Sequence, residues 1–474
     1  MPKKRPRICG SITMSISNIN SLASVSPINP LQDVQNNFAL IDLSGFFYIL
    51  NREQINNLLH GSDYVRLSYY KEKEGKLAIR RYLETRTHGL QDKEVAELLF
   101  NFMKSANTHV YSSVAFDPRP QPPEVLNLWR PHAIQPVPGN FDLLKQFILE
   151  IICNNDQVNY NYLINYLAHM IQKPEEKPLV AVLLLGGQGI GKGAFYTLIK
   201  TIWPYTVRQV QSIEEVTGRF TAAALEQSFA IWMDEAIFRG DKKSTDRLKA
   251  LISEDRLTIE EKFKPAVTMK SFHRIFGASN HEHFAPTERD DRRFFFLKVC
   301  EAWKQDASKF NPLFASYSDG HTVPGFVHHL LSLNLSSFSP AADRPKTTEH
   351  AKQKILSLEG LDRFLYEILQ AAEIPGSKAL YSRLAKEWIG KLEIATEDLK
   401  DAMTEFDRGA ERYRPMSASK LKPDLIKIFP TAKSTRFQDT NKSRRGIELP
   451  DIHQARKDFE QHVDCIIEWE SVED

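Results

Sequence analysis

The feature that most constrains the fold is an apolar run that ends in a glycine-rich turn. Residues 179–185 have the length and branching of a buried parallel β-strand. Glycines fill four of the positions 186–191, and Lys192 and a helix-like stretch over 194–200 follow. This order suits a triphosphate, because glycines let successive backbone N–H groups face the phosphates while the lysine and the helix N-terminus add positive charge. We predict a nucleotide site; the alternative is a strand-to-helix turn without a ligand.

The spacing of Gly186, Gly191 and Lys192 fits the P-loop pattern, in which the lysine reaches the β- and γ-phosphates. That pattern continues with Ser or Thr as an Mg²⁺ ligand, but this chain has Gly193. A water molecule, or Thr197 one turn later, is the expected substitute. The predicted nucleotide-binding residues are Gly186, Gly187, Gln188, Gly189, Ile190, Gly191, Lys192, Gly193 and Ala194.

A second apolar run, over 229–235, ends in two carboxylates. Its apolar residues lead to Asp234 and Glu235, and open α/β sheets place ligands at the carboxyl ends of their strands. In nucleotide hydrolases the first such acid holds Mg²⁺ and the second polarises the attacking water. An apolar run before two acids is common by chance. Downstream of a glycine turn and lysine, it predicts Asp234 as the metal residue and Glu235 as a catalytic residue.

The segment over 257–270 alternates like a β-hairpin and is interrupted at Lys264. Lys262, Phe263 and Lys264 lie near its tip, where two cations and an aromatic ring can grip a phosphate backbone and touch a base. We therefore predict a DNA-binding tip. A solvated hairpin without a ligand is the alternative.

Two more polar positions flank apolar strands. The run over 272–280 ends at Asn280, whose amide can hold the attacking water or sense the γ-phosphate; a simple turn cap is the alternative. Arg292 and Arg293 directly precede an apolar strand, where a guanidinium can reach the γ-phosphate of a neighbouring subunit. Structural pairing with Asp290 or Asp291 is the alternative for these arginines.

The composition is that of a soluble globular protein, with 42% hydrophobic and 26% charged residues in a chain of 474. A net charge of +2 requires any nucleic-acid surface to be local. Four cysteines without metal-type spacing suit a reducing compartment. No membrane-length apolar run and no signal-peptide pattern are present, so we expect a cytoplasmic protein without a membrane partner.

Shifts in composition and periodicity divide the chain into six predicted segments. A Ser-, Asn- and Pro-rich start predicts disorder, and two amphipathic helices over 141–170 predict a collar that joins subunits or merely covers the core. The segments are a disordered arm (1–36), a small α+β domain (37–135), a helical collar (136–175), an ATPase core (176–332), a linker (333–357) and a helical, winged-helix-like domain (358–474).

Basic residues gather near the end of the chain. A short basic helix over 417–429 precedes a polar, basic stretch over 432–449 that reads as a two-stranded wing. Helices followed by such a wing predict a winged-helix module, with Lys442, Arg444 and Arg445 as DNA-binding residues. A solvated basic surface is the alternative.

The ordered motifs resemble those of superfamily III helicases, and more closely the helicase half of phage, plasmid and satellite primase-helicases. Further matching stretches lie outside the core, and the resemblance runs over about residues 110–455; these stretches are 126–130, 165–174, 344–348 and 446–450. The resemblance implies an AAA+-like α/β core with a parallel central sheet, bound ATP and Mg²⁺, a homo-hexameric ring and movement along single-stranded or forked DNA. Gly193 is compatible with the phage-type subgroup.

The resemblance also implies roles for single residues. Lys192 would neutralise phosphate charge, Asp234 hold Mg²⁺, Glu235 activate water and Asn280 act as a sensor. Arg292, favoured over Arg293, would act on a neighbouring subunit, and Lys262 and Lys264 would touch DNA. Residues 1–110 show no paired carboxylates suited to nucleotidyl transfer, so we expect priming to come from a separate primase or polymerase chain.

The leading hypothesis from the sequence is an ATP-driven replicative DNA helicase of a mobile genetic element. A second hypothesis is an origin-binding initiator whose ATPase drives assembly, with the segment over 360–450 binding duplex DNA. A third is a defence ATPase built on the same core, which would hydrolyse nucleotide without separating strands.

Overall fold

The computed structural model describes most of the chain and divides it into two units by its internal contacts. The first unit extends to residue 113 and includes 123–125, and the second comprises 114–122 and 126 onward. The segment predicted as one domain over 37–135 is therefore split between them. The described ranges are 29–43, 45–61, 67–86, 91–219, 221–234, 242–260, 266–281, 291–375, 386–407, 418–439 and 442–471.

The first unit packs helices against a small sheet with the strand order β2-β1-β3. Its core is a cluster of apolar side chains that includes Phe38, Ile79 and Phe102. The elements are α1 (Pro30–Asn37), β1 (Phe38–Leu43), β2 (Phe46–Asn51), α2 (Arg52–His60), α3 (Glu72–Arg86), α4 (Asp92–Lys104) and β3 (Val110–Tyr111).

Helix α1 corrects part of the predicted disordered arm over 1–36. Asn29 caps this helix by accepting a hydrogen bond from the N–H of Leu31, Pro30 occupies its first turn, and Val34 is fully buried. A capped helix with a buried anchor is ordered despite its polar composition. Residues 1–28 lie outside the described part of the chain.

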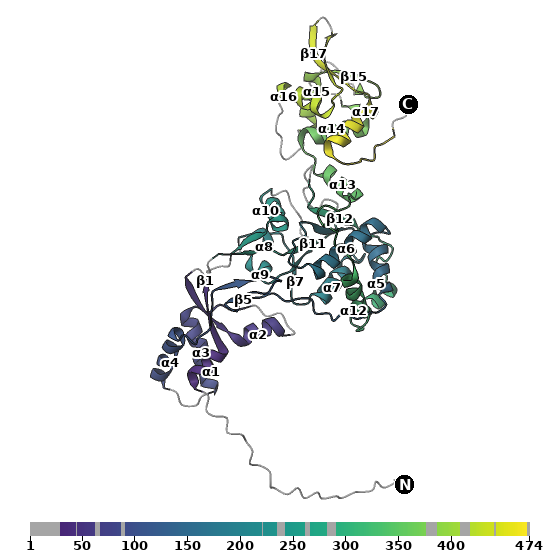
Figure 1. The fold of residues 1–474 in the computed structure, drawn as a ribbon. Coiled ribbons are helices and arrows are strands. Elements are labelled where there is room, and N and C mark those ends of the chain that lie inside the picture. The colour runs from purple at the N-terminus through teal and green to yellow at the C-terminus, as the bar shows by residue number, and fades with distance from the viewer. Residues whose placement is uncertain are drawn as a thin grey trace, which may run out of the picture. The chain divides into compact units, whose positions relative to one another are not determined.

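The second unit is built on a five-stranded sheet with the order β12-β6-β11-β8-β7, in which every neighbouring pair is parallel (Figure 1). The strands are β6 (Ala181–Leu185), β7 (Val207–Val210), β8 (Ala230–Asp234), β11 (Arg274–Ser279) and β12 (Phe294–Lys298). Side chains of β6 and β11 are buried throughout, as expected for a parallel sheet covered on both faces. The predicted α/β class with a parallel central sheet is confirmed.

Helices surround this sheet. They are α5 (Asp142–Gln146), which continues as the π-helix η1 (Phe147–Ile152), then α6 (Gln157–Gln172), α7 (Lys192–Ile202), α8 (Glu214–Thr217), α9 (Ala222–Leu225), α10 (Lys242–Ser253), α11 (Ala307–Ser316) and α12 (Thr322–Ser332). Two short antiparallel pairs complete the region, namely β4 (Ser113–Ala115) with β5 (Val125–Asn127), and β9 (Arg256–Ile259) with β10 (Val267–Lys270).

Helix α6 belongs to the core of its own chain. The hydroxyl of Tyr166 donates to the carbonyl of Val180 at 2.9 Å, and that of Tyr162 donates to the carbonyl of Pro340 at 2.6 Å. Both tyrosines are buried, as are most of their neighbours in the helix. This face of α6 therefore covers the core of its own chain, and a role of the segment over 136–175 in joining subunits stays a prediction.

The C-terminal part has a core of its own, around Phe364, Trp388 and Ile447. Its three-stranded antiparallel sheet has the order β15-β17-β16. The elements are α13 (Thr348–Leu356), α14 (Gly360–Ala371), β13 (Glu373–Ile374), β14 (Lys386–Glu387), β15 (Leu392–Ala395), α15 (Thr396–Asp407), α16 (Ala418–Ile428), β16 (Lys433–Asp439), β17 (Lys442–Leu449) and α17 (Ile452–Val463). Helix α13 shows that the end of the predicted linker over 333–357 is folded, because Thr347 caps it and His350 is buried.

Within the described residues, no helix has the length and apolar character that crossing a membrane requires.

Candidate functional site

Three strands of the parallel sheet end side by side, each next to a residue singled out by the sequence. Leu185, before the glycine turn, pairs in register with Ser279, which precedes Asn280. Asp234 pairs with Ala278 on the other side of the same strand. Parallel strands share one carboxyl edge, which is where open α/β sheets bind ligands. The glycine turn, Asp234 and Asn280 therefore meet at one edge of the sheet.

The glycine turn depends on backbone conformations that other residues adopt with strain. Gly186, Gly189 and Gly191 have φ values of 140°, 75° and 117°. Space is short as well, since a Cβ atom at Gly191 would lie 3.0 Å from the ring of Phe147 in the π-helix η1. Gly191 immediately precedes helix α7, so the turn presents the N-terminus of that helix.

Lys192 lies over the glycine turn. Its ammonium donates hydrogen bonds to the carbonyl oxygens of Gly186 and Gly187, the latter at 2.6 Å, and to the side-chain oxygen of Asn280 at 2.8 Å. An ammonium held by carbonyl and amide oxygens can exchange them for phosphate oxygens, which bind a cation more strongly. The contact with Asn280 links two sequence motifs directly.

Asp234 stands at the end of β8, and its carboxylate accepts a hydrogen bond from the side-chain amide of Gln209 at 2.8 Å. A carboxylate at this edge fits Mg²⁺, which is usually bound by one or two carboxylates together with substrate phosphates. Gln209 was not among the predicted site residues, although it is a polar residue inside the strand over 207–210. Glu235 lies outside the described residues, and among the described ones no cluster of three potential metal ligands occurs.

The hydroxyl predicted as a substitute metal ligand is engaged elsewhere. Thr197 donates its hydroxyl proton to the carbonyl of Gly193 at 2.9 Å, one turn along α7 from the glycine turn. A Cβ atom built on Gly193 would meet no other atom within 4 Å. The first turn of α7 therefore has room for a hydroxyl-bearing side chain at the position where the P-loop pattern carries one.

Arg292 and Arg293 lie at the opposite edge of the sheet, before the first residue of β12. Arg292 is exposed, whereas the N–H of Arg293 donates to the carboxylate of Asp291 at 2.8 Å. A strand of this length spans about 17 Å, which a single arginine side chain does not bridge. Neither arginine reaches the glycine turn of its own chain.

The predicted DNA-binding residues fall on two hairpins. Lys262, Phe263 and Lys264 lie outside the described residues, although the strands β9 and β10 that flank them pair antiparallel as predicted. The side chain of Lys442 lies outside the described part as well, although its backbone opens β17.

The two arginines of β17 differ in their surroundings. Arg444 makes two contacts with the carboxylate of Asp398, one of them at 3.1 Å, and thereby ties β17 to helix α15. Arg445 is exposed and lies directly opposite Arg436, which is exposed as well. Like charges placed directly across a sheet repel each other, so the outward pair suits an anionic ligand.

The fold and the site thus define a mixed α/β protein with a glycine turn, a lysine and a carboxylate at the carboxyl edge of a parallel sheet. The sequence matches a family of unknown function, DUF5906, over residues 184–293. This range contains the glycine turn, Asp234 and Asn280.

Known proteins that are similar to this chain include a replication protein of a phage. A DNA primase-polymerase of Nitratiruptor phage NrS-1 is 27% identical over 194 residues, which make up 38% of this chain and 26% of that protein. Two solved apo structures of the NrS-1 C-terminal region align with 89% of this chain and with 99% and 100% of theirs, at TM-scores of 0.58 and 0.56. Their identities of 17% and 16% show a shared fold.

Proposed function

We propose that this chain is an ATP-hydrolysing DNA helicase that acts in the replication of a phage or a related mobile element. The observation that carries the proposal is the 2.8 Å contact between Lys192 and Asn280 at the edge where Asp234 also ends its strand. Phosphoryl transfer needs a cation at the phosphates, a carboxylate for Mg²⁺ and a polar group near the attacking water. All three kinds of group are present within one edge of the sheet.

The proposed roles follow from these positions. The N–H groups of the glycine turn and the ammonium of Lys192 would bind the β- and γ-phosphates of ATP. Asp234, oriented by Gln209, would hold Mg²⁺, which neutralises phosphate charge when it is bound. Glu235 would accept a proton from the attacking water, and Asn280 would hold that water in line.

A ring of subunits is part of the proposal. Arg292 is exposed at the amino edge of the sheet, beyond reach of the glycine turn of its own chain, so its guanidinium would complete the site of a neighbour. A homo-hexamer that surrounds single-stranded or forked DNA satisfies this requirement. We expect this ATP-driven unwinding of DNA to take place in the cytoplasm of a bacterial host cell.

The similarity to a protein named a DNA primase-polymerase supports a place in phage DNA replication. This chain matches 26% of that protein, so the priming and polymerisation named for the relative are not carried over to it; a separate primase or polymerase chain is the proposed partner.

The proposal is tested by DNA-stimulated ATP hydrolysis and by unwinding of forked DNA. Lys192→Ala, Asp234→Asn and Glu235→Gln are expected to reduce both activities to background. Lys200→Ala removes an exposed lysine from the same helix and serves as the matched control. Undiminished hydrolysis in the Lys192 and Asp234 variants would exclude the assignment.

A second candidate function, an origin-binding initiator, is favoured by the exposed pair of Arg436 and Arg445 on the C-terminal ribbon. In that case the full chain binds one duplex sequence more tightly than random duplex, and Arg445→Ala abolishes the preference. Equal affinity for all duplex sequences would exclude the initiator function and leave the helicase proposal unchanged.

A further inference from the structure

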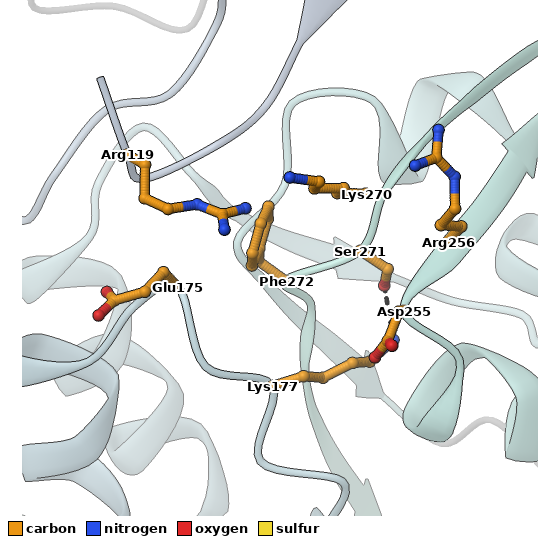
Figure 2. Close-up of a pocket in the computed structure, with 8 residues that line it drawn as sticks. All are labelled: Arg119, Glu175, Lys177, Asp255, Arg256, Lys270, Ser271 and Phe272. Atoms are coloured by element: carbon orange, nitrogen blue, oxygen red, sulfur yellow. Dashed lines mark hydrogen bonds between the residues drawn. The ribbon is translucent and has the colours of Figure 1, made fainter. Parts of the chain in front are cut away.

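A cleft of about 380 Å³ lies at the base of the β9–β10 hairpin. We name it the hairpin cleft; side chains that line it include Arg119, Lys177, Arg256, Lys270, Ser271 and Phe272 (Figure 2). Phe272 stands just before β11, whereas Asn280 stands just after it. The strand between them spans about 20 Å, so the cleft is separate from the glycine turn.

Two cations form the outer wall of the cleft. Arg256 and Lys270 are exposed and lie directly opposite each other in the β9–β10 register. Within the described part of the chain, the guanidinium of Arg256 has no ion pair, while the Lys270 ammonium lies 3.7 Å from Asp117. Placing like charges across a hairpin costs stability unless an anion lies between them. Asp117 offsets part of the charge of Lys270, so the guanidinium of Arg256 is the cation of this pair that points to an anionic ligand.

Beside these cations is a flat, fixed surface. Both Nε and Nη2 of Arg119 donate to the carboxylate of Asp117 at 2.8 Å, and the guanidinium carbon lies 5.4 Å from the centre of the Phe272 ring. Arg119 also keeps the pKa of the Asp117 carboxyl below its usual range. Phe272 itself is buried, with 5% of its surface exposed, so the guanidinium of Arg119 that it supports is the plane on which a single-stranded base can stack.

The floor of the cleft is held in place by buried contacts. Lys177 donates to the hydroxyl of Ser271 at 2.6 Å and to the carbonyl of Glu254, and burial lowers its pKa to about 7. Below this floor the buried Arg274 binds the carbonyl oxygens of Pro174 and Glu176 at 2.9 and 2.7 Å. The protonated form of Lys177 has three N–H donors, so in that form one remains for a ligand that enters the cleft, and an anionic ligand favours that form.

The balance of charge limits what the cleft can bind. Glu175 and Asp255 also line it, so its positive side chains are partly offset. The lining thus has a small excess of positive charge, which a phosphodiester unit with its single negative charge neutralises. This balance suits a nucleotide within a strand.

We propose that the hairpin cleft binds single-stranded DNA, with the phosphates bound by Arg256 and Lys270 and an adjoining base stacked on the guanidinium of Arg119, which Phe272 supports. This deepens the proposed helicase function and rests on it for the identity of the strand. DNA would then contact the base of the β9–β10 hairpin as well as the predicted DNA-binding residues at the hairpin tip.

The test uses the full chain and a labelled oligothymidylate, without ATP. The double variant Arg256→Ala/Lys270→Ala is expected to weaken binding about tenfold or more and to lower the slope of log affinity against log salt by about 0.7 for each phosphate that the variant no longer binds. Phe272→Leu removes the ring that supports the Arg119 guanidinium and is expected to weaken binding without changing that slope, because it removes no charge. Arg81→Ala/Lys93→Ala removes two exposed cations from the first unit and is the matched control.

Unchanged affinity and slope in the Arg256/Lys270 variant would overturn the inference, and both residues that this variant alters are exposed. Competition of the oligothymidylate by equimolar thymidine monophosphate would also overturn it, because the cleft would then be a free-nucleotide site. Since these measurements omit ATP, they are independent of hydrolysis. A parent chain that binds DNA through the cleft but has no ATPase activity would exclude the helicase proposal alone.

Discussion

The ammonium of Lys192 donates a hydrogen bond to the side-chain oxygen of Asn280 at 2.8 Å, although 88 positions of sequence separate the two residues. The pairing of β6 with β11 brings them together, because both residues follow neighbouring parallel strands at the same edge. The lysine after the glycine turn is thereby held next to the amide that ends β11.

This contact predicts different effects for two substitutions. Lys192→Ala is expected to weaken ATP binding strongly, since the phosphate charge loses its nearest cation. Asn280→Ala is expected to leave ATP binding within a few fold and to lower the rate of hydrolysis about a hundredfold, the usual effect of removing a positioned polar group. Titration with a fluorescent ATP analogue and steady-state ATPase assays measure the two quantities; equal losses of binding in both variants would contradict the assigned roles.

The open space around Gly193 predicts a gain of function. Gly193→Ser adds a hydroxyl where no atom lies within 4 Å of the new Cβ, so we expect hydrolysis at several-fold lower Mg²⁺ concentration. Gly191→Ala is the contrasting variant, because its φ of 117° and the nearby Phe147 ring disfavour any side chain. The measurement is the rate of ATP hydrolysis as a function of Mg²⁺ concentration. A Gly193→Ser variant that needed more Mg²⁺ than the parent chain would disprove the expectation.

The position of Arg292 predicts complementation between subunits. Arg292→Ala is expected to lower ATP turnover about 10³-fold, as removal of an arginine finger does. Mixing this variant with Lys192→Ala chains is expected to restore part of the activity, because each supplies what the other lacks. Mixtures no more active than their components would show that Arg292 does not act across an interface.

Substitution of the two arginines of β17 is predicted to have different effects, one on stability and the other on DNA binding. Arg444→Ala is expected to lower the free energy of unfolding by about 1 kcal/mol, since it removes the half-buried pair with Asp398. Arg445→Ala is expected to keep the stability and to weaken DNA binding. Denaturant unfolding and DNA titration of both variants check this; a DNA-binding loss confined to Arg444→Ala would reverse the assignment.

Buried histidines predict how stability depends on pH. Burial lowers the pKa of His273 from 6.5 to about 4, so the folded chain binds fewer protons than the unfolded chain between these values. The stability present above pH 6.5 is therefore lost as pH falls, by up to about 3 kcal/mol from this residue. Denaturation midpoints of the parent chain should fall more steeply over this range than those of His273→Gln, and parallel curves would contradict the prediction.

Local patterns in the sequence were enough to predict several elements of the site. The strand before Gly186, the helix after Lys192 and the hairpin over 257–270 each follow from apolar periodicity and turn chemistry among near neighbours. The parallel sheet followed as well, because strands buried on both faces are almost wholly apolar.

Tertiary structure alone decided which of these residues meet. The contact of Gln209 with Asp234, the pairing of Arg444 with Asp398 and the cleft walls formed by Arg119, Lys177 and Arg256 join segments far apart in the chain. The spacing of residues along the sequence reflects local backbone conformation. The distance between residues far apart in the sequence depends on strand order and helix packing. The local sequence therefore determines which chemical groups each motif contains, and the tertiary structure determines which residues those groups contact.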